Sequence, residues 1–591
     1  MPCGVAAKQH LISPAQQPKR LCLSLRLGLF LCWLLTSLPL TAQVRLEITP
    51  PQREIEQNVL AYLGEVSPRN TREMRRFAHY ARRQTQAALE ALGYYQAELE
   101  LSVEEGNPAS LLIRIQPGDP VRFGLIDLQL LNATDTLITL PQPEQLRTGQ
   151  RLSHQAYEAA KRNLRNQALE LGYFSYRFTR HEILIDPVEG IADVHLHFDP
   201  GPRYQLGEVV FQHEGELSDD FLQRFVRFAP GTPYHIQWLA DLNRDLRASG
   251  YFQEVLLETQ EDELIPHQLR VEAQLRMRAP RTLNLGLGYS TDIGPRVTAQ
   301  WTQHWMNQQG FSRGFETEVS EPRQGLELWW QKPLGRPATD RLRLTSSITQ
   351  ESFDEQESLR YGAGLAWHHR QANQWDRIIS LRGEREDFRV GETEDATWLT
   401  LPGLSYARVQ RDRPLDPQRG YRLQMDLLGS RETLLSDVDL LQLQLAAKAL
   451  TTWRLQHRFL ARLQLGGLAT SNFERVPASL RFYAGGDQSV RGYAYQDLAP
   501  RNSRDELVGG RYLISSTLEY QYQFSDRWRW AGYVDAGQAT RTPNELLEPK
   551  VGVGTGLRWI SLVGPIKLDV AYGLDDEQGG WRIHFSMGPD L

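Results

Sequence analysis

The C-terminal half of the chain, from about residue 281 to residue 591, consists of short segments in which apolar and polar residues alternate. Successive side chains of a β-strand point to opposite faces, so each segment would have one apolar face and one polar face. Segments of about ten residues, separated by turn residues, give a count of about sixteen strands. Clear examples are Leu283-Asn284-Leu285-Gly286-Leu287-Gly288-Tyr289, Ile566-Lys567-Leu568-Asp569-Val570-Ala571-Tyr572 and Trp581-Arg582-Ile583-His584-Phe585-Ser586-Met587.

Hydropathy restricts how such a chain can cross a membrane. Beyond the N-terminal segment no window approaches about 18 apolar residues, so no transmembrane helix is expected. Only helices and closed barrels satisfy the backbone hydrogen bonds in lipid. Twelve of the 14 tryptophans lie in this half, as expected for interfacial girdles. We therefore predict a transmembrane antiparallel β-barrel of about 16 strands over residues 280–591; a soluble all-β propeller or sandwich is the alternative.

The N-terminus has the features of a secretory signal peptide. Four basic residues accompany an apolar run from Leu27 to Leu40, which Thr41-Ala42 follows, so a signal peptide is predicted over residues 1–42. All three cysteines lie there, so the mature chain would have no disulfide and no cysteine-ligated metal. Loss of the four cations would change the net charge from −6 to −10, which argues against a nucleic-acid partner.

A threefold repeat fills the region between the signal peptide and the barrel. The sequence Ala91-Leu92-Gly93-Tyr94-Tyr95 recurs in related form at 170–174 and 248–252. Each glycine would end a helix in a left-handed conformation, after helices over roughly 70–92, 154–171 and 236–249. We predict three α+β modules of β-α-α-β-β order at 43–120, 121–202 and 203–279; unrelated α+β domains are the alternative. A free sheet edge in such a module can bind an extended peptide by strand addition.

One motif lies in the longest gap between two predicted strands. A long ordered loop in such a place is usually functional. Arg491 offers five N–H donors in a fixed geometry, which suits anchoring a loop on a buried carboxylate. A solvent-exposed turn is the alternative. The motif reads Gly485-Gly486-Asp487-Gln488-Ser489-Val490-Arg491-Gly492-Tyr493.

These features together resemble the Omp85 superfamily. The modules resemble its POTRA domains, and their order and number are most similar to the TamA branch of the superfamily. Two later motifs are also similar to family motifs: Tyr533-Val534-Asp535-Ala536-Gly537, and the glycine run at 552–556 with the strand that follows it. The resemblance implies that the loop folds into the lumen, where Arg491 contacts Asp535, with Asp569 as second choice. Solvation of both acids by lumen water is the alternative.

The same resemblance implies a location and a function. The barrel would lie in the outer membrane with the modules in the periplasm. It would insert or translocate outer-membrane proteins such as autotransporters, working with a TamB-like periplasm-spanning partner. Family proteins are also implicated in phospholipid movement, so unfolded outer-membrane proteins and outer-membrane lipid are the expected ligands.

A lateral seam between the strands at about 282–290 and 580–588 would be the working part of the barrel. Glycines weaken strand pairing because they offer no side chain to pack, and a free edge can template an incoming strand. The runner-up function is a two-partner-type secretion pore that exports a soluble substrate, a class that usually has two modules and a plug helix. The proposed seam residues are Leu285, Gly286, Gly288, Ile583 and Phe585.

No enzyme site is expected. The chain has no Walker loop, and no helix follows the glycine run at 552–556. His195 and His197 share one face of a predicted strand, but two histidines alone make a poor metal site. The sequence therefore predicts no cofactor and no metal.

Overall fold

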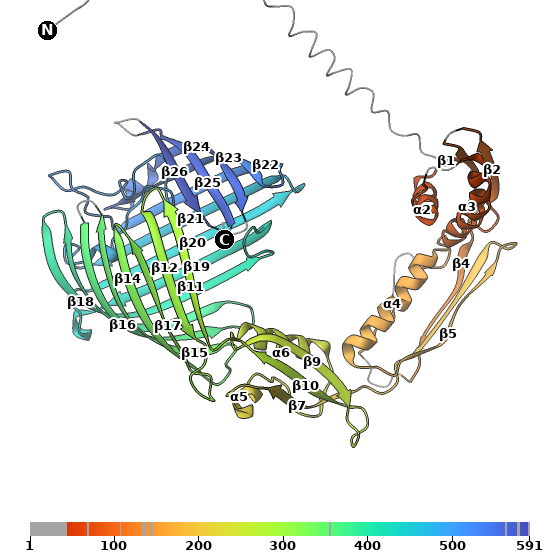
Figure 1. The fold of residues 1–591 in the computed structure, drawn as a ribbon, viewed down its shortest axis with the longest axis horizontal. Helices are drawn as coiled ribbons and strands as arrows, with labels where there is room; N and C mark the ends of the chain where they lie inside the picture. The colour runs from red at the N-terminus through yellow and green to blue at the C-terminus, as the bar shows by residue number, and fades with distance from the viewer. Residues whose placement is uncertain are drawn as a thin grey trace, which may run out of the picture. The chain divides into compact units, whose positions relative to one another are not determined.

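The computed structural model describes residues 44–67, 70–106, 108–132, 137–141, 146–353, 356–561, 564–575 and 580–588 (Figure 1). The predicted signal peptide lies outside these residues. The chain divides into two compact units, one ending at Tyr204 and one starting at Gln205. Across the described ranges, no helix is both long enough and apolar enough to cross a membrane.

The first unit contains two small α/β modules. In the first of them, β3 is the central strand, parallel to β1 and antiparallel to β2. The two helices bury Ile55 and Met74 against Leu111 and Ile113 of β3, which forms the module core. Its elements are β1 (Val44–Ile48), α2 (Arg53–Leu63), α3 (Thr71–Ala91), β2 (Glu98–Glu104) and β3 (Ser110–Gln116).

The second module repeats this topology. Its sheet order is β4-β6-β5, with β6 parallel to β4 and antiparallel to β5. Its described residues contain one helix where two were predicted; Pro141 disfavours a helix in the segment before it. The elements are β4 (Arg122–Leu130), α4 (His154–Leu171), β5 (Arg177–Asp186) and β6 (Ile191–Asp199).

The second unit begins with a third module. Its sheet order is β8-β7-β10-β9, and β10 is again parallel to β7 and antiparallel to β9. Gly93, Gly172 and Gly250 each follow a helix with φ of 90°, 88° and 83°, so the predicted left-handed helix ends are confirmed. The elements are β7 (Gln205–His213), α5 (Asp219–Gln223), β8 (Thr232–Pro233), α6 (Ile236–Ala248), β9 (Phe252–Glu261) and β10 (Gln268–Met277).

This third module contacts the first turns of the barrel. The Tyr251 hydroxyl donates a buried hydrogen bond to the carbonyl of Gly310 at 2.7 Å. The guanidinium of Arg224 donates to the carbonyl of Leu334. Two separate turns of the barrel are therefore tied to one module.

The barrel is a single sheet of 16 strands, each antiparallel to its neighbours in chain order. This confirms the predicted strand count and rules out a propeller or a sandwich of two sheets. The strands are β11 (Arg281–Ser290), β12 (Gly294–Gln303), β13 (Ser312–Ser320), β14 (Arg323–Pro333), β15 (Asp340–Phe353), β16 (Gln356–Arg370), β17 (Asp376–Val390), β18 (Thr393–Arg411), β19 (Arg419–Ser430), β20 (Leu440–Trp453), β21 (His457–Thr470), β22 (Tyr512–Ser525), β23 (Trp528–Thr540), β24 (Lys550–Ser561), β25 (Gly564–Gly573) and β26 (Trp581–Met587).

Alternation along the strands separates an outer apolar face from a polar interior. On β23, Val534 is exposed whereas Asp535 beside it is fully buried. On β22, Leu518 is 68% exposed and its neighbour Glu519 is 8% exposed. Exposed apolar side chains and buried charges are the reverse of a water-soluble fold, and they match a barrel with lipid outside and a polar lumen.

The first and last strands meet at one end only. No ladder pairs β11 with β26 among the described residues. Just after β11, the backbone N–H of Thr291 donates to the carbonyl of Phe585 at 3.2 Å, and the N–H of Phe585 donates to the Thr291 hydroxyl at 2.7 Å. The first and last strands therefore meet over a short stretch, and most of both edges is unpaired in the described residues.

Candidate functional site

The segment between β21 and β22 folds back against the inner faces of β22 to β25. Its central residues are buried: Val490 is 0% exposed and Tyr493 is 3% exposed. The Tyr493 hydroxyl donates to the carbonyl of Val551 on β24 at 3.1 Å. The loop motif predicted from the sequence is therefore packed inside the barrel, and the alternative of a solvent-exposed turn is wrong.

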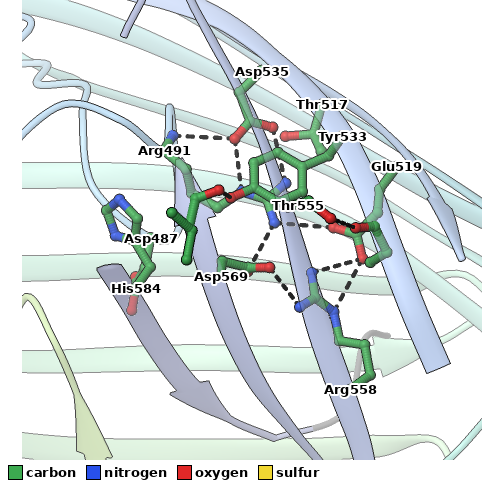
Figure 2. Close-up of polar contacts among 12 residues, drawn as sticks. Asp487, Arg491, Thr517, Glu519, Tyr533, Asp535, Thr555, Arg558, Asp569 and His584 are labelled. Carbon is green, nitrogen blue, oxygen red and sulfur yellow. Dashed lines mark hydrogen bonds and ion pairs between the residues drawn. The ribbon is translucent and has the colours of Figure 1, made fainter. Parts of the chain in front are cut away.

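Arg491 makes the central contact of this loop (Figure 2). Its Nε donates to Asp535 Oδ2 at 2.7 Å and its Nη2 to Asp535 Oδ1 at 3.1 Å, which is a bidentate pair. Its Nη1 donates to Glu519 at 3.0 Å and to Asp569 at 3.1 Å. The guanidinium also lies over the ring of Tyr533, with its carbon 3.3 Å from the ring centroid.

A second arginine completes the cluster. Arg558 on β24 donates to Asp569 at 2.6 Å and to Glu519 at 3.0 Å. Arg462 on β21 donates to the loop carbonyl of Ser489 at 2.7 Å. Three cations thus accompany three carboxylates, and pairing of this kind is what makes buried charge tolerable. We call Arg491, Arg558, Glu519, Asp535 and Asp569 the loop anchor.

The glycine run on β24 makes room for the loop. Gly552 pairs with Asp535 across the β23–β24 ladder, and a methyl group added to it would overlap the carbonyl oxygen of Arg491. A methyl group on Gly556 would overlap the carboxylate of Asp569. Glycine at these positions therefore allows a close approach that any larger side chain would block.

The loop touches both sides of the junction between β11 and β26. The N–H of Asp487 donates to Asp292, in the turn after β11, at 2.6 Å. The N–H of Gly492 donates to Nε2 of His584 on β26 at 3.1 Å. Burial, followed by the nearby Asp292 carboxylate, raises the pKa of Asp487 to about 7.

The predicted seam residues are not all opposite one another. Phe585 contacts Thr291, and its ring lies 5.6 Å from that of Tyr289. Leu285 and Ile583 are exposed on the outer face. Gly286 and Gly288 pair with Thr298 and Arg296 of β12. The structure thus places Phe585 at the contact and Leu285 further along the unpaired edge of β11.

Sequence reasoning missed several members of the site: Glu519, Arg558, Tyr533, Asp292 and His584. Glu519 had a readable signal, because it is an acid between the apolar Leu518 and Tyr520 in an alternating strand. The three glycines of the loop motif were predicted. Gly485, Gly486 and Gly492 have φ between 93° and 108°, a region of backbone conformation that favours glycine.

Comparisons with known proteins agree with this architecture. The Omp85 superfamily domain matches residues 279–590, and the POTRA domain TamA domain 1 matches residues 45–117. The outer membrane protein assembly factor BamA of Nitratidesulfovibrio vulgaris is 22% identical over 427 residues, which cover 68% of this chain and 53% of that protein. The BamA of Neisseria meningitidis serogroup B is 22% identical over 564 residues, covering 82% of this chain and 69% of that protein.

A solved structure shares the fold. BamA from Haemophilus ducreyi lacking POTRA domains 1–3 superposes with a TM-score of 0.61 at 15% identity, covering 75% of this chain and 95% of that one. The present chain spans about half the length of the N. vulgaris relative. With the family domain matched across the whole barrel, the chain belongs to the Omp85 superfamily, as an outer-membrane barrel with a periplasmic POTRA domain at residues 45–117.

Proposed function

We propose that this chain is an outer-membrane assembly factor that inserts or translocates outer-membrane proteins, such as autotransporters, at the junction of β11 and β26. The observation that carries the proposal is the absence of a ladder between these strands in the part of the barrel that the structure describes. Unpaired N–H and C=O groups on a strand edge can accept an incoming strand. The relatives named as assembly factors support the same function.

The strand lengths near this junction also support it. β26 has 7 residues and β11 has 10, whereas β18 has 19. A tilted strand needs about 9–11 residues to cross the hydrocarbon core. A short strand beside an unpaired edge favours local thinning of the bilayer, which lowers the barrier to inserting a new strand.

A disulfide lock tests the proposal directly. Thr291 and Phe585 already share two hydrogen bonds, so the pair Thr291→Cys and Phe585→Cys should cross-link on oxidation. We expect oxidation to lower the rate at which the barrel assembles its outer-membrane protein substrates (its clients) by about tenfold or more. An activation barrier raised by about 1.4 kcal/mol already slows a reaction tenfold. Reduction should restore activity.

The control pair is Tyr572→Cys with Trp581→Cys, which joins β25 to β26 at positions already paired in the ladder. That lock should leave assembly unchanged. Full activity of the oxidised Thr291–Phe585 variant would overturn the proposal. Continued export of a soluble substrate through the locked barrel would instead indicate a two-partner-type secretion pore.

The modules are proposed to bind a TamB-like partner that spans the periplasm. The match of residues 45–117 to the TamA POTRA domain supports this partner. In the second module β5 is an edge strand, and its Leu184 is 49% exposed. A photo-cross-linking amino acid at Leu184 should capture the partner, whereas one at the exposed Arg162 on α4 should not. Equal capture at both positions would contradict docking on this edge.

Lipid is the second proposed ligand of the seam. Phospholipid transfer can be assayed separately from protein assembly in the same locked and unlocked barrels. Loss of both activities on oxidation would assign them to one seam.

A further inference from the structure

A cluster outside the barrel joins three potential metal ligands in the second module. β4 and β6 run parallel, with Asp127 beside His195 and Gln129 beside His197. Val194, Leu196 and Phe198 alternate with the histidines and are fully buried in the module core. His195 and His197 therefore lie on the opposite face of the sheet, together with Asp127.

The geometry of these three side chains is close. His197 Nε2 lies 2.6 Å from Asp127 Oδ2, and His195 Nδ1 lies 3.1 Å from the same oxygen. All three ligand atoms lie within 4.8 Å of one another. The other carboxylate oxygen of Asp127 accepts a 2.8 Å hydrogen bond from Gln129, which fixes the orientation of Asp127. Side-chain exposure is between 11% and 23%, so the cluster can be reached from solvent.

We propose that Asp127, His195 and His197 form a binding site for a divalent transition metal, of which Zn²⁺ is the best fit. Two imidazole nitrogens and one carboxylate oxygen suit Zn²⁺ and do not suit the oxygen-rich coordination of Ca²⁺ or Mg²⁺. Bonds of about 2.1 Å place tetrahedral ligand atoms about 3.4 Å apart. Small side-chain rotations from the observed separations reach that spacing, and three protein ligands leave one position for water.

Asp127 suits this role because an aspartate carboxyl group is ionised at neutral pH, as a metal ligand must be. Gln129 would act as the orienting partner of the ligand, since it contacts Asp127 through the oxygen that faces away from the histidines.

The alternative is that the three residues only hold β4 to β6 by hydrogen bonds. Metal titration of the full mature chain in detergent, without a polyhistidine tag, separates the two. We expect calorimetry to show a single tight equivalent of Zn²⁺, and Co²⁺ to give the visible bands of a four-coordinate site. Asp127→Asn and His197→Gln should each weaken binding by about tenfold or more, and Gln129→Leu by about tenfold.

His181→Gln is the matched control. His181 lies on β5 of the same module, opposite Leu196 in the ladder and hence on the other face of the sheet, and its replacement should leave Zn²⁺ affinity unchanged. Circular dichroism without metal verifies that each variant folds. Absence of stoichiometric Zn²⁺ binding in the unmodified chain, or equal affinity in chain and ligand variants, would overturn the proposal in favour of hydrogen bonding alone.

Discussion

The junction of β11 with β26 and the loop anchor lie in the same barrel and are held in opposite ways. At the junction, the hydrogen bonds between the described parts of the two edges lie around Thr291 and Phe585. At the anchor, Arg491 alone makes five hydrogen bonds to three buried carboxylates. The wall is thus weakest at the proposed seam, while the loop beside it is fixed by charge pairs with little access to water.

This difference between the junction and the loop anchor indicates which contacts we expect to break and re-form while the protein works. Exposed strand edges can exchange partners because water or an incoming strand can satisfy their backbone groups. Buried ion pairs cannot separate without leaving an uncompensated charge. We therefore expect strand pairing at the junction to vary while the anchor stays intact.

Replacement of the anchor arginine should have the largest effect. Arg491→Ala leaves Asp535 buried without its bidentate partner, whereas Glu519 and Asp569 keep Arg558. This loss costs about 3–5 kcal/mol of loop docking. Limited proteolysis should then cut the loop, and client assembly should fall with it.

Arg501→Ala is the control for that variant. Arg501 lies in the same loop but pairs with Asp497 at a partly exposed site, where ion pairs contribute little. A protease-resistant loop in Arg491→Ala would show that the anchor does not hold the loop.

Hydrogen exchange should show a smaller but direct difference between wall regions. The amides of β11 that face β26 have no ladder partner, whereas β17 and β18 pair along 15 positions from Asp376 to Val390. We expect the edge amides of β11 to exchange about 100-fold faster than those of β17. Equal protection in the two strands would mean that the seam is closed in solution.

A change of pH should have the smallest effect. The raised pKa of Asp487, about 7, means that the docked loop binds a proton that the undocked loop releases near pH 4. Docking of the loop is thus most favourable below the ordinary pKa of an aspartate, and it weakens as the pH rises through 7. Protease sensitivity of the loop should increase a few-fold from pH 5.5 to pH 8, and Asp487→Asn should flatten that profile.

Much of the fold could be read from the sequence because it depends on local patterns. Alternation gave the sixteen strands, and the glycines after Leu92, Leu171 and Ser249 marked the helix ends. The contact of Arg491 with Asp535 followed from resemblance, and the structure places the two side chains 2.7 Å apart.

The remaining features depend on contacts between distant segments. Glu519 and Arg558 join the anchor because β22 and β24 flank β23, which strand periodicity alone does not specify. Asp127 lies 68 residues before His195 and meets it through the parallel pairing of β4 and β6. How far β11 pairs with β26 depends on both strands together, so the sequence of either strand alone does not predict it.

Through its hydrogen bonds to Asp292 and His584, the loop connects the two sides of the junction between β11 and β26. The turn after β11 and the strand β26 are each held by a backbone N–H from the same short stretch, at Asp487 and Gly492. Parting the strands must release at least one of these bonds. A fluorescent reporter on the loop would therefore report whether the proposed seam opens.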